Sequence, residues 1–392
     1  MNTARGANHL PKLTILFGAG STIGSGMPST PIITDRLLQL GQPNTPTAGQ
    51  IRPFFSELSN ILITHGGFSS VNFEHLLHAM EMLEPLLGNY DNHPFQINDY
   101  FRPVLKPLVE PTESTQQLLC NGCSISYWRG TAFRQIAQLF SESVSNSQPK
   151  ETHLADFLSQ LTPHFTLRLF TLNYDDLVDR VQLPWNDGFV SNNSDYYQPF
   201  DPKQFLSQNE APAPLLVHLH GSTRFGYAQD GIFDIHKYKS PEVALNHAQD
   251  KGFSQNVNGK MIFSGPMISG LSKIEQLLYR PCPYGYYLKS FIDNVLETPR
   301  LLVLGYGGLD RHINEWILQF AQLHGRSSKL AYVAPVETFD TQAVIGAAAN
   351  TLEPLCRKSQ LPYYGQNLAV ETALFPFEDG QVSHRLIDFL AK

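Results

Sequence analysis

The sequence predicts an α/β protein in which a doubly wound parallel sheet carries a large helical insertion. Short apolar runs end at a Gly, Asn or Pro at five places along the chain, which is typical of buried parallel strands. Segments with helical spacing of apolar residues alternate with these runs, and that alternation favours a parallel sheet wound on both faces. Between the first and second runs the pattern is largely helical, and this stretch forms the predicted insertion.

The first strand is expected at Leu13–Phe17, where an apolar run rich in β formers stops abruptly at a glycine turn. Helical spacing follows at Ile32–Leu40, and the apolar stripes at Phe54–Leu62 and Phe73–Leu83 belong to the insertion. The remaining strands are expected at Thr166–Thr171, Leu215–Leu219, Arg300–Leu304 and Lys329–Val333. This succession of strands and helices predicts a Rossmann-like sheet.

These patterns divide the chain into a sheet domain and an insertion. The sheet domain, which is expected to bind a nucleotide, comprises residues 1–35 and 161–392, and the helical insertion comprises residues 36–160. Within the sheet domain, residues 224–287 are rich in glycine and poorly periodic. Such a stretch indicates a small module or a flap over the site.

The composition indicates an ordinary globular enzyme of the cytoplasm. Hydrophobic residues make up 42% of the chain and charged residues 16%. The balance of 28 Lys and Arg against 35 Asp and Glu gives a net charge of −7, which argues against direct binding of nucleic acid. The sequence has no apolar run of membrane-spanning length, and its start, Met1–Lys12, lacks a signal-peptide core. Cys120 and Cys123 form a C-x-x-C without a second pair, so no metal is expected.

Every informative motif lies at the carboxyl end of a predicted strand, where open parallel sheets bind their ligands. After the first strand, glycines let the backbone approach a pyrophosphate, and the following helix end favours its negative charge. The candidate residues of this turn are Gly18, Ala19, Gly20, Ser21, Thr22 and Pro28. The spacing is not the G-x-G-x-x-G of a dinucleotide-dependent dehydrogenase, and a purely structural tight turn is the alternative.

The next two strand ends supply polar side chains. Asn173 is suited to hold a ribose hydroxyl or a water, and Asp175 is suited to accept from a carboxamide or to cap the following helix. Strand alternation sends His218 and His220 to one side of the sheet. Only His220 adjoins Gly221 at the strand terminus, so its ring is expected in the site and His218 in the core.

The strand end at residues 305–310 offers a second glycine-rich backbone surface for a nucleotide. Gly305 and Gly307 allow close approach, and Asp310 is expected to cap the next helix or to bind a sugar. In the insertion, Glu74 and the two histidines that follow it lack the i, i+4 spacing of helical metal ligands. These three are therefore interpreted as surface or interface polar residues.

In their order along the chain, these motifs resemble those of the sirtuin family. The shared elements are a glycine-alanine-glycine turn, a G-x-P turn, T-x-N-x-D, an H-G pair and a late glycine-rich strand end, and they cover residues 13–35 and 163–336. The resemblance implies a site for NAD in which the glycine turns, together with Gly221 of the H-G pair, fix the nucleotide and Asp175 holds the carboxamide. It also implies that Asn173 and His220 act at the ribose.

Two departures from the protein-deacylating sirtuins point to another branch. Ser29 follows Pro28 where those enzymes continue with D-F-R, and no four-cysteine zinc module follows the H-G pair. The insertion and the ending Gly305–Asp310 instead resemble the sirtuin-like, NAD-hydrolysing effectors of bacterial antiphage defence. That resemblance implies hydrolysis of the nicotinamide–ribose bond, giving nicotinamide and ADP-ribose, by an enzyme held inactive until triggered. It also implies a homo-oligomer and a partner such as a HerA-type ATPase or another defence protein.

Two alternatives use the same fold. An NAD-dependent protein deacylase would pass the ribosyl group to an acyl-lysine oxygen, and the two departures argue against it. A non-catalytic sensor would bind NAD-derived nucleotides without turnover, and the pair Asn173 and His220 argues against it. Because the nicotinamide ring is already a cationic leaving group, cleavage mainly requires stabilisation of an oxocarbenium-like ribose.

Overall fold

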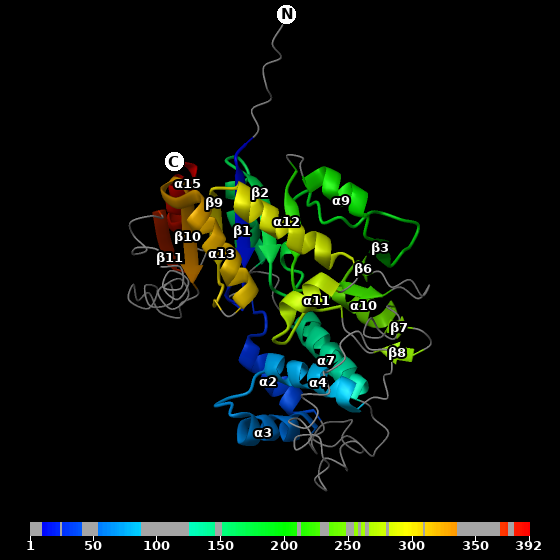
Figure 1. Ribbon diagram of the computed structural model, residues 1–392. Coiled ribbons are helices and arrows are strands. Elements are labelled where there is room, and N and C mark those ends of the chain that lie inside the picture. Colours follow the sequence, from blue (N-terminus) through cyan, green and yellow to red (C-terminus); the bar gives the residue numbers. More distant parts are fainter. Residues whose placement is uncertain are drawn as a thin grey trace, which may run out of the picture.

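The computed structural model describes residues 10–23, 26–40, 54–87, 125–145, 151–209, 213–227, 235–247, 255–257, 260–262, 266–279, 282–308, 310–334, 369–374 and 380–392. At its centre is a six-stranded sheet in the order β11-β10-β9-β1-β2-β4, in which all neighbours pair in parallel (Figure 1). Its strands are β1 (Lys12–Phe17), β2 (Thr166–Thr171), β4 (Leu215–His218), β9 (Arg300–Leu304), β10 (Lys329–Ala334) and β11 (Ala369–Leu374). The order reverses between β1 and β9, as in a doubly wound Rossmann sheet, so the predicted fold class is confirmed.

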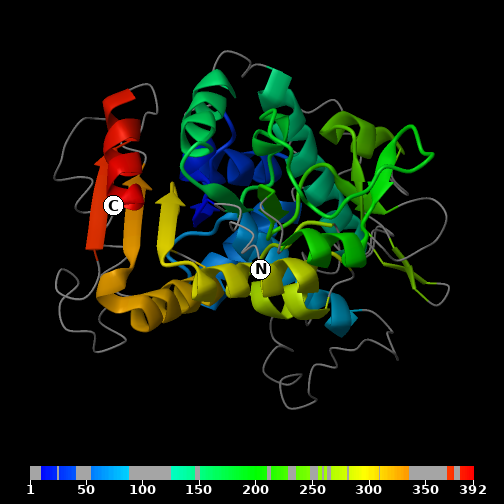
Figure 2. The ribbon, with the colours of Figure 1, turned by 90° about the horizontal axis from the view of Figure 1, so that it is seen from above.

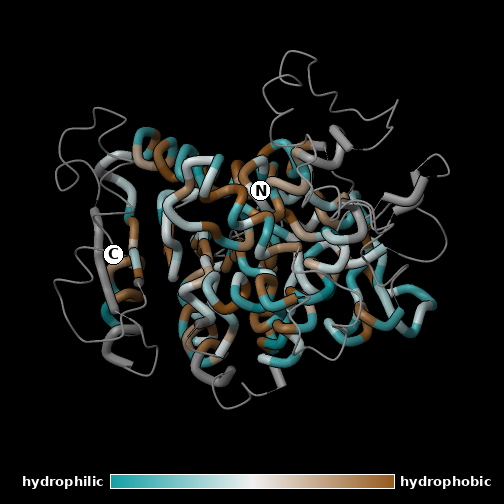
Figure 3. The backbone as a smooth tube through the Cα atoms, turned by 90° about the horizontal axis from the view of Figure 1, so that it is seen from below, coloured by the Kyte–Doolittle hydropathy of each residue, from teal (hydrophilic) through white to brown (hydrophobic). Residues whose placement is uncertain are grey.

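Helices cover both faces of this sheet because successive strand residues are apolar on both sides. Ile15 and Phe17 belong to a core shared with α8 (Glu151–Leu161) and α15 (Gly380–Ala391). The intervening Leu16 belongs to a second core, shared with α12 (Tyr284–Glu297) and α13 (Arg311–His324). Figure 2 shows α12 and α13 along one side of the sheet and α15 on the other, and in Figure 3 the hydrophobic segments gather toward the interior. Burial on both faces explains the continuous apolar runs of the sequence.

A group of helices lies at the carboxyl end of the sheet, below it in Figure 1. It comprises α2 (Thr30–Leu38), α3 (Phe54–Gly66), α4 (Phe73–Leu87) and α7 (Ile125–Ser145), which pack against one another. The rings of Phe54 and Trp128 stack with centroids 4.9 Å apart and join α3 to α7. Since α2 begins before residue 36 and continues past it, the expected domain boundary falls inside a helix, and the division into domains stays a prediction.

Smaller elements follow the second and third strands of the sheet. The strands β3 (Tyr197–Pro199), β5 (Phe225–Tyr227) and β6 (Ile235–Tyr238) form an antiparallel sheet, and β7 (Gln255–Val257) pairs with β8 (Lys260–Ile262). The short helices are α1 (Gly20–Ile23), η2 (Val178–Arg180), α9 (Pro202–Asn209), α10 (Pro241–His247), α11 (Lys273–Tyr279) and η4 (Gly325–Ser327). Within the described ranges, no helix has both the length and the apolar character needed to cross a bilayer.

Candidate active site

The carboxyl ends of β1, β2, β4 and β9 surround a cavity of about 500 Å³, which we call the strand-end cavity. All the residues predicted for the site line it except Ser21 and Gly221. The lining is completed by residues from the helices at this end of the sheet and by aromatic residues, namely Thr30, Ile33, Asn72, Phe73, Glu74, Phe140, Leu172, Tyr174, Lys273, Tyr306 and Tyr332. A cavity of this size is within the usual range of small-molecule sites.

The two glycine turns form one wall of the cavity and lie against each other. A Cβ at Gly18 would stand 2.5 Å from the Cα of Tyr306, and a Cβ at Gly305 would stand 2.0 Å from the backbone nitrogen of Ser21. The N–H of Gly20 donates to the carbonyl of Gly305 (2.9 Å), and the N–H groups of residues 18, 21 and 22 also donate within the protein. The glycines are therefore required for the contact between the turns, and the pyrophosphate contact stays a prediction.

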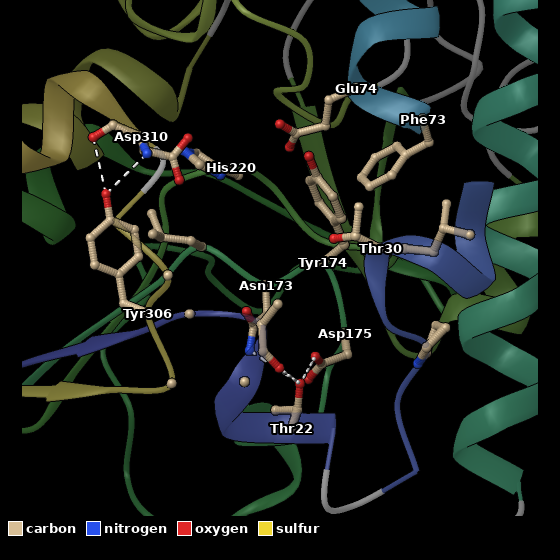
Figure 4. A pocket seen from close by; sticks show the side chains of 18 of the residues that line it. Thr22, Thr30, Phe73, Glu74, Asn173, Tyr174, Asp175, His220, Tyr306 and Asp310 are labelled. Atoms are coloured by element: carbon tan, nitrogen blue, oxygen red, sulfur yellow. Dashed lines mark hydrogen bonds between the residues drawn. The ribbon is translucent and has the colours of Figure 1, made fainter. Parts of the chain in front are cut away.

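Asn173 and Asp175 are tied to the first turn by a chain of hydrogen bonds (Figure 4). The Nδ2 of Asn173 donates to the hydroxyls of Ser21 (3.1 Å) and Thr22 (3.2 Å), and the Thr22 hydroxyl donates to Asp175 Oδ2 (3.0 Å). The other Asp175 oxygen accepts from the N–H of Leu177 (3.2 Å). Asp175 thus closes the turn before η2 and lines the cavity, but it does not cap that helix, whose N-cap residue is Leu177. Asn173 Oδ1 is buried without a hydrogen-bond partner among the described residues.

The ring of His220 enters the cavity with one nitrogen anchored and the other free. It forms a hydrogen bond with the backbone of Leu172, while Nε2 is buried and has no partner within the described part of the chain. Nδ1 therefore donates to the carbonyl of Leu172, which leaves Nε2 as an acceptor in the neutral ring. Burial, reinforced by the nearby Lys273 ammonium, holds the pKa of His220 well below its usual range. The ring is thus neutral at pH 7 and able to take a proton.

His218 and His220 have different neighbours, as predicted, although strand alternation alone would send both to one side of the sheet. The strand β4 ends at His218, so the alternation does not extend across the turn to residue 220. His218 Nε2 bonds to the carboxylate of Asp179 (2.9 Å), which also pairs with Lys237 and Arg224. His218 lies in the core, as predicted. Gly221, with φ of +84°, turns the chain where a Cβ would stand 2.5 Å from the Tyr284 hydroxyl, so its nucleotide contact stays a prediction.

Asp310 and Glu74 meet at Lys273 on the cavity wall. Asp310 precedes α13, but its side chain makes no capping bond; its Oδ1 instead lies 2.7 Å from Lys273 Nζ. Glu74 Oε1 lies 2.8 Å from the same nitrogen. Of the two interpretations of Glu74, surface or interface residue, the structure agrees with the second, because Glu74 pairs with Lys273 of α11 and lines the cavity. Sequence spacing gave no signal for Glu74 or Lys273, since they meet only in the folded chain.

Burial disfavours the charged form of the Asp175 carboxyl. Burial raises its pKa to about 6, from an ordinary value of 3.8, despite the hydrogen bonds from Leu177 and Thr22. The folded state therefore binds a proton that the unfolded state releases between these two pH values. The contribution of this carboxyl to the free energy of unfolding is therefore greatest below this pH window. It falls as pH rises through the window, by about 3 kcal/mol for a two-unit shift in pKa.

Asp175→Asn should consequently stabilise the fold at pH 8 by about 1–3 kcal/mol relative to wild type, because the amide carries no charge to desolvate. At pH 4 the wild-type carboxyl is protonated in the folded protein, so the difference should nearly vanish. Urea unfolding of both proteins at the two pH values measures this. A variant that is less stable than wild type at pH 8 would show that the buried carboxylate of Asp175 does not destabilise the fold.

Among the described residues, no group of three His, Cys, Asp or Glu side chains is arranged to hold a metal ion. Cys282 is a partly buried thiol that forms no disulfide with another described residue. The pair Cys120 and Cys123 lies outside the described residues, as does Cys356.

Comparison with known proteins agrees with these motifs. Residues 167–350 match the family model of a SIR2-like domain. No curated protein matches the chain. Among solved structures, a mutant Sir2 homologue in complex with ADP-ribose is 13% identical, with a TM-score of 0.41 over 97% of this chain and 91% of that one. A complex of Sir2 with a p53 peptide and NAD+ is 13% identical, with a TM-score of 0.35 over 91% of this chain and 96% of that one. The family match thus shows that residues 167–350 are similar to a SIR2-like domain.

Proposed function

We propose that this protein hydrolyses NAD at the bond between nicotinamide and ribose. One observation carries the proposal: His220 Nε2 and Asn173 Oδ1 are buried polar atoms of the same cavity, and each lacks a partner among the described residues. Buried polar atoms are nearly always paired, so two such acceptors in one cavity call for a ligand rich in hydroxyl groups. A ribose with its attacking water meets that need, and the SIR2-like domain favours NAD as its source.

The chemistry needs little acid catalysis. As the C1′–N bond breaks, its electron pair neutralises the pyridinium nitrogen, and nicotinamide leaves as a neutral molecule. Asn173 orients the ribose or the water, and His220 Nε2 takes the proton from the water as its oxygen bonds to C1′. Asp175 accepts from the carboxamide of the nicotinamide, and the turns at residues 18–22, with Pro28, and 305–307 hold the rest of the nucleotide.

Chromatography of NAD incubated with the purified protein tests this function. We expect equal amounts of nicotinamide and ADP-ribose from wild type, and a rate lower by about 10²-fold for Asn173→Ala, which loses one polar contact at the reacting ribose. Asn294→Ala is a matched control, because Asn294 is also buried but lies on α12 outside the cavity lining. Intact NAD after incubation with wild type would contradict the proposal, and deacetylation of an added acetyl-lysine peptide would favour the deacylase.

We further propose that the activity belongs to a regulated effector of antiphage defence, because the insertion and the strand end at residues 305–310 resemble such effectors. An enzyme that depletes NAD must be restrained in its host, so a homo-oligomer or a HerA-type partner is expected to control it. Light scattering of the protein, alone and mixed with the product of a neighbouring gene, tests this. A monomer with the same full activity in both samples would contradict it.

A further inference from the structure

A buried ion triad closes one side of the strand-end cavity. Lys273, the first residue of α11, pairs with Glu74 of α4 and with Asp310 at the end of the loop after β9. Only 8% of the Lys273 side chain is exposed, against 14% for Asp310 and 26% for Glu74. Three segments that are distant in sequence are thereby held together at one point of the cavity wall.

The triad lies next to the ring that acts as base in the proposed function. The charges of Lys273 and Asp310 act directly on His220, and the ring of His312 lies 5.7 Å from that of His220. Figure 4 shows Asp310 beside His220, with Glu74 on the same side of the cavity, and Asp175 and Thr22 across from them. The side that holds the carboxamide is thus opposite the side that holds the triad.

We propose that this triad determines which acceptor reaches the ribose, admitting water and other very small molecules and excluding acceptors with an alkyl chain. The inference rests on the proposed function. An acceptor must place its proton within hydrogen-bond reach of His220 Nε2, so it must occupy the space that the triad borders. An alkyl chain there would have to displace a buried ammonium from its carboxylates, whereas water would not.

The two outcomes differ only in the oxygen that is captured. Water forms the O–C1′ bond, passes its proton to His220 and gives ADP-ribose. An alcohol forms the same bond, passes its hydroxyl proton to the same nitrogen and gives the alkyl glycoside of ADP-ribose. In both cases the C1′–N electron pair leaves with nicotinamide. The ratio of the glycosides therefore reports on access to the site, independently of the overall rate.

Solvolysis of NAD in dilute methanol or 1-butanol, analysed by chromatography, measures this ratio. For wild type we expect butyl capture at least about tenfold below methyl capture at equal concentration, as pockets discriminate by added methylene groups. Glu74→Ala opens space in the wall and leaves the Lys273–Asp310 pair in place, so it should fold. We expect this variant to raise the butyl-to-methyl ratio by about tenfold.

Glu81→Ala is the matched control, because Glu81 lies on the same helix and bonds to Gln276 of α11 (3.3 Å) but does not line the cavity. Its ratio should equal that of wild type. An unchanged ratio in Glu74→Ala would overturn the inference while the proposed function stands. A folded Glu74→Ala protein that releases no nicotinamide would also overturn it, since the triad would then serve bond cleavage itself. Absence of nicotinamide release from wild type would overturn the proposed function and this inference together.

Discussion

Replacement of His220 by alanine is expected to lower nicotinamide release by about 10²- to 10⁴-fold while NAD binding stays within about tenfold of wild type, as for loss of a general base. The ring is anchored to the Leu172 backbone, Nε2 has no partner among the described residues, and His220 lines the cavity. Removing it deletes the proton acceptor without disturbing the glycine turns. Single-turnover kinetics, with NAD binding measured by calorimetry, separate the two effects.

The pH dependence gives a second expectation for the same ring. Since burial lowers the pKa of His220, the wild-type rate should not fall as pH is lowered from 8 to 6.5, the ordinary pKa of histidine. The rate should fall below about pH 6, because the carboxyl of Asp175, whose pKa burial raises to about 6, becomes protonated there. His312→Ala is the control, because this neighbouring ring does not line the cavity. Equal losses in the two histidine variants would remove the assigned role of His220.

Gly305→Ala is expected to have the largest effect on stability, with a loss of more than about 4 kcal/mol or no folded protein. The residue has φ of +62°, which disfavours any side chain, and a Cβ would overlap the backbone of Gly20 and Ser21. These are backbone atoms at the start of α1, so no flexible side chain can move aside.

Gly307→Ala provides the comparison, because a Cβ at Gly307 would meet nothing within 4 Å. We expect this variant to unfold within about 1 kcal/mol of wild type in urea. Similar stability of the two alanine variants would mean that the turns after β1 and β9 do not touch as described.

The sequence predicted most strands of the central sheet and the site residues at their ends, because the break that ends most of the apolar runs also marks the position of a site residue. Apolar runs that stop at Gly, Asn or Pro located five strands, and the glycines and polar residues after them account for half of the cavity lining. The edge strand β11 was not predicted, because Glu371 and Thr372 interrupt its apolar pattern, as is common at sheet edges.

The contacts between distant segments could not be predicted. Glu74 and Lys273 are 199 positions apart and meet only because α4 lies at the carboxyl end of the sheet, near α11. Asp310 stands at the N-cap position where a helix cap was expected, but its carboxylate pairs with Lys273 of α11 and does not cap the helix.

The most direct test is a crystal structure of His220→Ala with intact NAD. The central claim is that one sugar lies between Asn173 and the position of the missing imidazole. We predict the nicotinamide ribose within hydrogen-bond distance of Asn173 Oδ1, with the carboxamide at Asp175. A nicotinamide ribose bound elsewhere, with Asn173 Oδ1 still without a partner, would contradict the account.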